Sequence, residues 1–193
     1  MKRALGKLPY MYPIPITLVG ALVNGRPNFE TIGDTGLVGI HPPLVFVSSH
    51  REHHTNAGIL EMRTFSINFP TTAMLPRVDL CGSVSGREVD KAALFEVFYG
   101  ETGSAPMIAE CPVNLECRLL EEFSFQHRQV FIGELVQCFA SPEYVSEQDG
   151  RPRLADLTRL DPILYALDNH YYSVGAILGE GYQEAVKWEG KAP

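Results

Sequence analysis

Apolar and polar residues alternate along much of this chain, and a period of two residues predicts β-strands rather than helices. The alternation is clearest at residues 64–69, where Phe and Ile side chains share one face and Thr64, Ser66 and Asn68 share the other. Such a strand packs one face on the core and turns the other toward solvent or a ligand. We therefore expect Asn68 to project from a polar face.

Other segments carry the same signature. Residues 113–119 alternate as well, which predicts that Asn114, Glu116 and Arg118 point outward. Further strands are predicted at residues 15–23, 27–32, 44–48 and 129–140. The last of these is apolar on both faces, so both faces need cover, and this indicates a subunit interface.

The connections between the predicted strands are short. Asn24-Gly25 predicts a type I′ hairpin, because both central positions of that turn need a positive φ. Helices are predicted only at residues 55–62, 71–78 and 90–98, the last with Asp90 as its N-cap. Strands joined by tight turns, with helices as insertions, predict a mainly β fold, a β-barrel with peripheral helices. A parallel doubly wound sheet would need helices between most of its strands.

Length and composition suit a single globular domain. The chain has 193 residues, of which 45% are hydrophobic and 20% charged, and it shows no internal repeat or linker-like tract. We expect one domain over residues 1–193, with roughly 9 residues at the N-terminus and roughly 13 at the C-terminus as extensions.

The charge of the chain restricts its ligands. Sixteen Lys and Arg residues against 23 Asp and Glu residues give a net charge of −7, which repels polyanions and argues against nucleic-acid binding. An anionic ligand must therefore be held by a local cluster of donors.

The expected location is the cytoplasm. Three prolines interrupt the apolar N-terminal run that could imitate a signal peptide, and no apolar stretch is long enough to cross a membrane. The four cysteines form no C-x-x-C pair, which favours free thiols in a reducing compartment.

The most informative motif is Ser48-Ser49-His50-Arg51-Glu52-His53-His54-Thr55, where a buried strand ends and a helix begins. Hydroxyls, an arginine, imidazoles and the free N–H groups of a helix start are suited to binding a phosphate dianion. Two alternatives remain: a solvated loop with Thr55 as N-cap, and a metal site using His50, His54 and either Glu52 or His53.

Three further segments could contribute to a site. Gly33-Asp34-Thr35-Gly36-Leu37-Val38-Gly39 could bring backbone N–H groups close to a flat heterocycle, or could be an irregular connection. Cys81-Gly82-Ser83-Val84-Ser85-Gly86-Arg87 offers polar donors, and Cys81 is better explained as a buried thiol than as a nucleophile. His170-Tyr171-Tyr172-Ser173 could stack on a planar cofactor, although aromatic residues in a late strand are more often core.

Several short motifs follow one another between about residue 10 and residue 179. They are Val19-Gly20-Ala21, Asn24 to Thr31, Pro42-Pro43, Arg51 with Thr55, Phe65 to Asn68, Cys81-Gly82 with Ser85-Gly86, Asp90-Lys91, Leu94 to Gly100, Ala105 to Ile108 and Cys111 to Cys117. In this order and spacing the chain resembles the flavoredoxin branch of the flavin reductase-like, FMN-binding split-barrel family.

The resemblance implies a homodimer that holds FMN near its interface, with the phosphate at the loop after the third strand. It implies no catalytic side chain and no metal. The residues that it implies for the cofactor site are Asn28, Thr31, Ile32, Gly33, Ser48, Ser49, His50, Arg51, Thr55, Asn68, Ser85, Gly86 and Lys91.

The expected function is that of an FMN-dependent oxidoreductase. Electrons would pass from a reduced donor, NAD(P)H or a redox protein, through FMN to a second acceptor. The alternatives are an FMN-binding electron carrier without turnover and a metal hydrolase that uses His50 to His54. The chain departs from the family at Gly33-Asp34-Thr35. An aspartate that faces the flavin would oppose the anionic reduced form of the flavin and lower the flavin's reduction potential.

Overall fold

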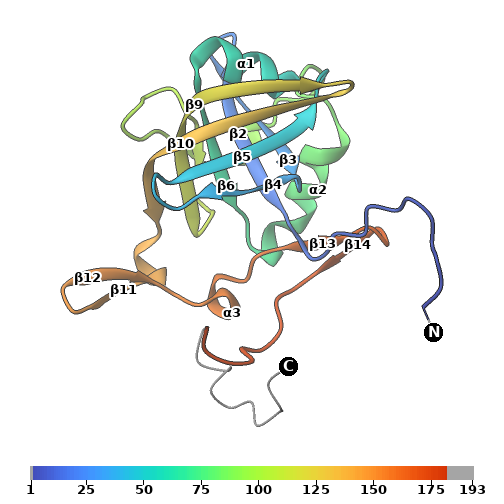
Figure 1. Ribbon diagram of the computed structural model, residues 1–193. Coiled ribbons are helices and arrows are strands. Elements are labelled where there is room, and N and C mark those ends of the chain that lie inside the picture. Colours follow the sequence, from blue (N-terminus) through green and yellow to red (C-terminus); the bar gives the residue numbers. More distant parts are fainter. Residues whose placement is uncertain (1, 182–193) are drawn as a thin grey trace.

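The computed structural model describes residues 2–181, so most of the expected C-terminal extension lies outside the described residues. The fold is dominated by one seven-stranded antiparallel sheet (Figure 1). In spatial order its strands are β3 (Arg26–Ile32), β2 (Thr17–Val23), β6 (Thr64–Phe69), β9 (Val113–Phe125), β10 (Arg128–Ala140), β5 (Leu44–His50) and β4 (Thr35–Gly39). The mainly β architecture is confirmed.

The sheet curls around one apolar core. In Figure 1, β9, β10 and β5 lie in front of β2, β3 and β6. Val19, Val47, Phe65 and Phe131 come from four different strands and are buried together in this interior. The edge strands β3 and β4 are not paired with each other in the sheet that the structure describes, so the sheet stays open.

The hairpin between β2 and β3 forms as predicted. Asn24 has φ 52° and Gly25 has φ 74°, the positive values that the two central turn positions require. The turn fixes the register in which Val23 pairs with Arg26 and Leu18 pairs with Thr31. It thereby sets which residues of β3 reach the site described below.

The predicted polar face of β6 is buried, which corrects the expectation for Asn68. Thr64 is 7% exposed, and Ser66 and Asn68 are fully buried. The chain near Pro106 and Ile108 covers this face: Ser66 Oγ donates to Pro106 O, and Asn68 Oδ1 accepts from Ile108 N at 3.1 Å. The polar side chains are tolerated because their hydrogen bonds are made inside the protein.

Two outward-facing predictions for β9 are wrong for the same reason. Asn114 is 3% exposed and donates to Asn68 Oδ1 at 2.8 Å. Glu116 is fully buried and accepts hydrogen bonds from the backbone N–H groups of Glu101 (2.9 Å) and Thr102 (2.7 Å). Arg118 is exposed, as predicted.

Helices cover the periphery of the sheet. Helix α1 (His54–Met62) lies across β2, and η1 (Thr72–Met74) leads into α2 (Leu75–Ser83), which packs on β3. The first two predicted helices are therefore present, although the second runs on to Ser83. A second apolar cluster, which includes Leu18, Phe29 and Val78, fills the space between α2 and the sheet.

The third predicted helix, residues 90–98, does not form. The chain makes a short turn, η2 (Ala92–Leu94), in which Ala92 N donates to Asp90 Oδ1 at 3.1 Å. It then enters β7 (Val97–Phe98), which pairs with β8 (Met107–Ile108). Phe95 packs edge-on against Phe29, with ring centroids 5.6 Å apart. This tertiary contact and the strand pairing outweigh the local helical pattern.

The two ends of the described chain both lie below the sheet, well apart from each other (Figure 1). Strands β1 (Ile14–Pro15), β13 (Leu164–Ala166) and β14 (His170–Tyr172) form a small sheet beside the N-terminal arm. The intervening elements are η3 (Pro142–Tyr144), β11 (Val145–Gln148), β12 (Arg151–Leu154) and α3 (Leu157–Leu160). Within residues 2–181, no helix combines the length and the apolar character that crossing a membrane requires.

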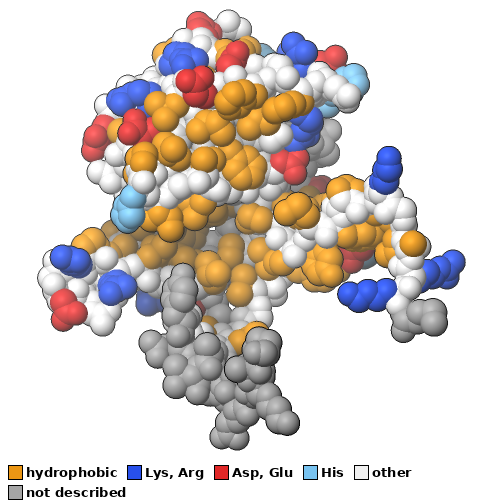
Figure 2. All heavy atoms as spheres, in the orientation of Figure 1, with side chains coloured by type: hydrophobic (Ala, Val, Ile, Leu, Met, Phe, Trp, Pro, Cys, Tyr) orange, Lys and Arg blue, Asp and Glu red, His pale blue; other side chains and the backbone are white. Residues whose placement is uncertain are grey.

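The outer face of the large sheet is unusually apolar. Figure 2 shows hydrophobic side chains gathered over its front, where β9, β10 and β5 lie. Phe46 pairs with Ile132, and Val130 pairs with Phe123, so these four share that face. The first three are half-buried, and Phe123 is 48% exposed. We call them the sheet-face patch.

Candidate functional site

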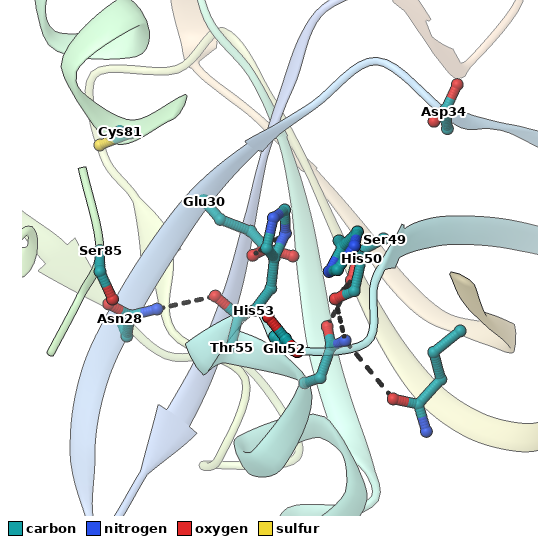
Figure 3. Close-up of polar contacts among 12 residues, drawn as sticks. Asn28, Glu30, Asp34, Ser49, His50, Glu52, His53, Thr55, Cys81 and Ser85 are labelled. Atoms are coloured by element: carbon teal, nitrogen blue, oxygen red, sulfur yellow. Dashed lines mark hydrogen bonds and ion pairs between the residues drawn. The ribbon is translucent and has the colours of Figure 1, made fainter. Parts of the chain in front are cut away.

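A cleft of about 410 Å³, which we call the polar cleft, opens beside β3. Asn28, Glu30 and Thr31 of β3 form one wall, the junction of β5 and α1 forms a second, and the chain from the end of α2 to Lys91 forms the third. The lining residues outside β3 are His50, Glu52, His53, His54, Thr55, Cys81, Gly82, Ser83, Val84, Ser85, Arg87 and Lys91. Figure 3 shows this arrangement, with Asn28 and Glu30 facing the β5–α1 junction.

A second hollow of about 390 Å³ continues the polar cleft, because Thr31, Gly82 and Ser83 line both. We call it the aromatic cleft. Tyr165 and Tyr171 form part of its wall, with ring centroids 5.4 Å apart. Its other lining residues are Ile14, Ile16, Gly33, Asp34, Asp79, Leu167 and Asn169. Together the two clefts form a trough that carries basic and acidic groups at one end and two tyrosines at the other.

The trough continues past the polar cleft in the opposite direction. A further hollow of about 650 Å³ shares Asn28, His54, Arg87 and Lys91 with the polar cleft. Its remaining lining residues are Val23, Asn24, Arg26, Pro27, Gly86, Glu88, Val89 and Asp90. The basic side chains therefore mark the end of the trough that is farthest from the tyrosines.

Buried hydrogen bonds hold the β5–α1 junction in place. Asn28 Nδ2 donates to Thr55 Oγ1 at 2.7 Å, which ties β3 to the first turn of α1. Asn56 Nδ2 donates to His50 O at 2.9 Å, and Asn56 Oδ1 accepts from Ser49 Oγ at 2.5 Å. The helix begins at His54 with His53 as N-cap, so the alternative in which Thr55 is the N-cap is wrong.

The basic residues of the trough are held by backbone carbonyls. Lys91 is 4% exposed, and its Nζ donates to Cys81 O at 2.6 Å. Arg87 Nη1 donates to Glu52 O at 3.1 Å. Burial lowers the pKa of Lys91, and the nearby Cys81 and Glu30 oppose that shift. Burial also lowers the pKa of His54, and the neighbouring positive charges of Arg87 and Lys91 add to the effect.

Cys81 is unsuited to act as a nucleophile. It is 1% exposed, and burial raises the pKa of its thiol to about 11, so the thiolate is scarce near neutral pH. The interpretation of Cys81 as a buried thiol agrees with the structure. All four cysteines of the chain are free, and only Cys138 is exposed.

The structure brings eight of the predicted site residues to the trough. Those in the polar cleft are Asn28, Thr31, His50, Thr55, Ser85 and Lys91. Gly33 lines the aromatic cleft, and Gly86 lines the hollow at the basic end. At Gly86 a Cβ would lie 2.0 Å from Asn28 Oδ1, so only glycine fits against that side chain.

Five predicted site residues do not line the trough, and Arg51 is one of them. Arg51 is exposed, and its Nη1 donates to Gln126 O at 3.4 Å. The guanidinium in the polar cleft belongs to Arg87 instead, which follows Ser85-Gly86 in sequence. Arg51 therefore does not line the polar cleft in this structure, and its role at the phosphate stays a prediction.

The other four residues do not line the trough because of burial and strand direction. Ile32 and Asn68 belong to the interior of the fold, at 5% and 0% exposure. Ser49 is also fully buried and is bonded to Asn56. Ser48 points to the opposite face of β5, where its Oγ accepts from Arg128 Nε at 3.3 Å. Alternation along β5 therefore sends Ser48 and Ser49 to different sides, and neither lines the trough.

The cofactor residues implied by the resemblance did not include Glu30, His53, His54 and Arg87, which line the polar cleft. Glu30 Oε2 lies 3.1 Å from His53 Nδ1, and both residues line the polar cleft. The only available signal was the strand period, because Glu30 lies two residues after Asn28 and so shares its face of β3. His53, His54 and Arg87 belonged to motifs already noted, but the sequence did not show their direction.

The metal alternative lacks a ligand set. Within residues 2–181, no group of three or more His, Cys, Asp or Glu side chains is arranged to hold a metal ion. The rings of His50 and His53 are 5.9 Å apart, and His50 stacks on His127 at 6.0 Å. The histidines therefore contact one another and Glu30 rather than converging on one point.

Comparison with known proteins gives the class to which this fold and site belong. The family described as "Flavin reductase like domain" matches residues 10–175, and the chain belongs to that family. The chain is 39% identical to flavoredoxin from Methanosarcina acetivorans, with a TM-score of 0.90 over 97% of this chain and 98% of that one. It is 31% identical to flavoredoxin of Desulfovibrio vulgaris (Miyazaki F), with a TM-score of 0.85 over 96% and 100%.

A third similar structure is an FMN-binding protein from Thermus thermophilus, solved with bound 1-cyclohex-2-enone. The identity is 31% and the TM-score 0.72, over 90% of this chain and 94% of that one. The predicted family and the predicted split-barrel fold are both confirmed by these likenesses.

Proposed function

We propose that this protein is an FMN-dependent oxidoreductase that passes electrons from a reduced donor such as NAD(P)H to a second acceptor. Membership of the flavin reductase-like family supports a flavin-related role. The likeness to two flavoredoxins and to a protein named as FMN-binding supports FMN as the flavin. The observation that carries the proposal is the trough itself, with basic groups at one end and tyrosines at the other.

The trough residues fit FMN along its whole length. Arg87 and Lys91 offer cationic donors for a phosphate in a chain whose net charge is −7. At the other end, Tyr165 and Tyr171 offer apolar faces to a planar ring system. Gly33 and Gly82 line the same cleft without side chains that would hold a flat ligand away.

When bound, FMN would supply the redox chemistry, and the protein would supply binding, orientation and electrostatics. Lys91 is fixed by Cys81 O, so its charge is already in place before a phosphate binds. The hydrogen bond from Asn28 to Thr55 holds the cleft wall at a fixed spacing. No side chain in the trough needs to act as a nucleophile, because the flavin would carry the redox chemistry. The protonated thiol of Cys81 is consistent with this.

The direct test is a flavin titration of the purified apoprotein. We expect FMN to bind in a 1:1 ratio, with quenched flavin fluorescence and absorption bands near roughly 370 and 450 nm. NADH and NADPH oxidation is then measured with free FMN present. Failure of FMN to bind at micromolar concentrations would rule out the proposal.

The runner-up is an electron carrier without substrate turnover, which the 39% identity to a flavoredoxin favours. The two functions differ in what reduces the bound flavin. An oxidoreductase consumes NAD(P)H steadily when free flavin is supplied. A carrier is reduced only by a partner protein, so NAD(P)H oxidation stays at the background rate.

We further propose that the protein is a cytoplasmic homodimer. The four free cysteines support a reducing compartment. The sheet-face patch supports self-association, because contiguous exposed apolar surface is characteristic of interfaces. Sedimentation analysis is expected to give a dimer that Ile132→Glu dissociates. Val145→Glu, on the hairpin of β11 and β12, is the matched control and should leave the dimer intact.

A further inference from the structure

One carboxylate in the trough is incompletely bonded. Glu30 is 5% exposed, and its Oε2 pairs with His53 Nδ1 at 3.1 Å. Its Oε1 is the one buried side-chain oxygen or nitrogen without a hydrogen-bond partner among residues 2–181. Glu30 lines the polar cleft from β3, and Figure 3 shows its side chain beside that of His53 from the β5–α1 junction.

A buried carboxylate oxygen without a donor is unfavourable, because it has lost water and gained nothing in return. The basic neighbours do not offer such a donor in this arrangement. Lys91 Nζ donates to Cys81 O, and Arg87 Nη1 donates to Glu52 O. The unpaired oxygen therefore points to a ligand that brings its own hydrogen-bond donor.

The position of Glu30 along β3 indicates which part of a ligand it meets. Asn28, two residues earlier, reaches the basic end of the trough, and Gly33, three residues later, lines the aromatic cleft. Thr31, the next residue, lines both the polar and the aromatic cleft. Glu30 thus lies between the end suited to a phosphate and the end suited to a ring.

A phosphate dianion has no proton to donate and would be repelled by a carboxylate. The chain that joins ring and phosphate in FMN carries hydroxyl groups, which are donors of the kind that Oε1 lacks. A hydrogen bond from a hydroxyl to a carboxylate is charge-assisted and therefore stronger than a neutral one.

We propose that Glu30 recognises the hydroxylated ribityl chain of the flavin, with Oε1 accepting a hydrogen bond from a ribityl hydroxyl. His53 is the positioning residue, because its contact with Oε2 fixes the carboxylate. This inference rests on the proposed function, and it adds that the site selects its ligand by the side chain of the flavin. Flavins with a polyol side chain bind in preference to flavins without one.

The test compares three ligands that differ only along this chain: FMN, riboflavin, and lumiflavin, which carries ring and methyl groups alone. Dissociation constants are measured by fluorescence quenching for the wild type and for Glu30→Met, which keeps the size of the side chain and removes both acceptors. We expect FMN and riboflavin to bind about tenfold more weakly to the variant, as for loss of one charge-assisted hydrogen bond. Lumiflavin should change by less than about twofold.

Two controls separate recognition from folding. Glu30→Gln retains an acceptor oxygen and should restore most of the affinity for FMN and riboflavin. Glu61→Met makes the same chemical change at an exposed position of α1 and should alter none of the three constants. The melting temperature of the flavin-free Glu30→Met protein should not fall, because the variant removes a buried, half-paired charge.

Three results would overturn the inference: unchanged affinity for all ligands in Glu30→Met, an equal loss for lumiflavin, or a loss for FMN without one for riboflavin. The last of these would assign Glu30 to the phosphate instead. If the wild type binds none of the flavins, the proposed function fails, and the inference fails with it. If it binds all three equally tightly, only the inference fails.

Discussion

The guanidinium of Arg128 forms an ion pair with the carboxylate of Asp34 at the rim of the aromatic cleft. The two residues are 94 positions apart in sequence and meet because β10 pairs with β5, which pairs with β4. Arg128 Nη2 also donates to Ser48 O at 2.7 Å, which fixes the cation. The negative charge of Asp34 is therefore partly compensated, and its expected opposition to a reduced flavin is weakened.

We predict that Arg128→Gln lowers the midpoint potential of the bound flavin. The variant leaves Asp34 uncompensated beside the aromatic cleft, and an uncompensated anion disfavours added electrons. Asp34→Asn should raise the potential, and the double variant should return close to the wild-type value. Spectroelectrochemical titration measures all three. Because both side chains are largely exposed, the folding stability should change by less than about 1 kcal/mol.

A second prediction concerns the two arginines of the neighbouring loops. Arg87→Gln should weaken FMN binding about tenfold while leaving riboflavin unchanged, since only FMN carries the phosphate. Arg51→Gln is the matched control and should have little effect, because Arg51 lies outside the polar cleft. Fluorescence titration gives the constants. If Arg51 proved to be the sensitive residue, our assignment of the anion to the basic end of the trough would be wrong.

Gly86 provides a test of packing at the basic end. A methyl group there would meet Asn28 Oδ1 at 2.0 Å and His54 Cδ2 at 3.1 Å, so Asn28 must move away from Thr55. We expect Gly86→Ala to destabilise the protein by about 1–3 kcal/mol and to weaken FMN binding. Chemical denaturation measures the first effect. As a control, Gly150→Ala makes the same change in open space, but at a backbone φ of 69°. Any smaller loss of folding stability in that variant reports backbone strain alone.

The lowered pKa of His54 predicts how stability depends on pH. The unfolded chain binds this proton at a higher pH than the folded chain, so stability falls as the pH drops below about 6.5 toward the folded-state pKa. Above that window His54 is neutral in both states and contributes no slope. In His54→Gln the slope below about pH 6.5 should be smaller, as followed by urea denaturation at each pH. An unchanged slope would assign the acid sensitivity to other groups.

The sequence alone determined most strands of the sheet, although residues 33–39, expected to be a loop, contribute β4 (Thr35–Gly39). Residues 64–69 form β6 as predicted, and Asn24-Gly25 makes the predicted turn, because both depend on local periodicity and turn chemistry. The motifs that begin at Ser48 and at Cys81 do supply walls of the trough. These features depend on neighbours in the sequence, so the sequence is sufficient to reveal them.

Only the tertiary structure decided which of these side chains face the site. Alternation shows that the two faces of a strand differ, but Asn68 and Glu116 are buried because distant chain segments cover them. The inward turn of Arg87 and the pairing of Glu30 with His53 depend on β3, α1 and the loop after α2 meeting in space. Such tertiary contacts join residues tens of positions apart, so no local sequence pattern predicts them.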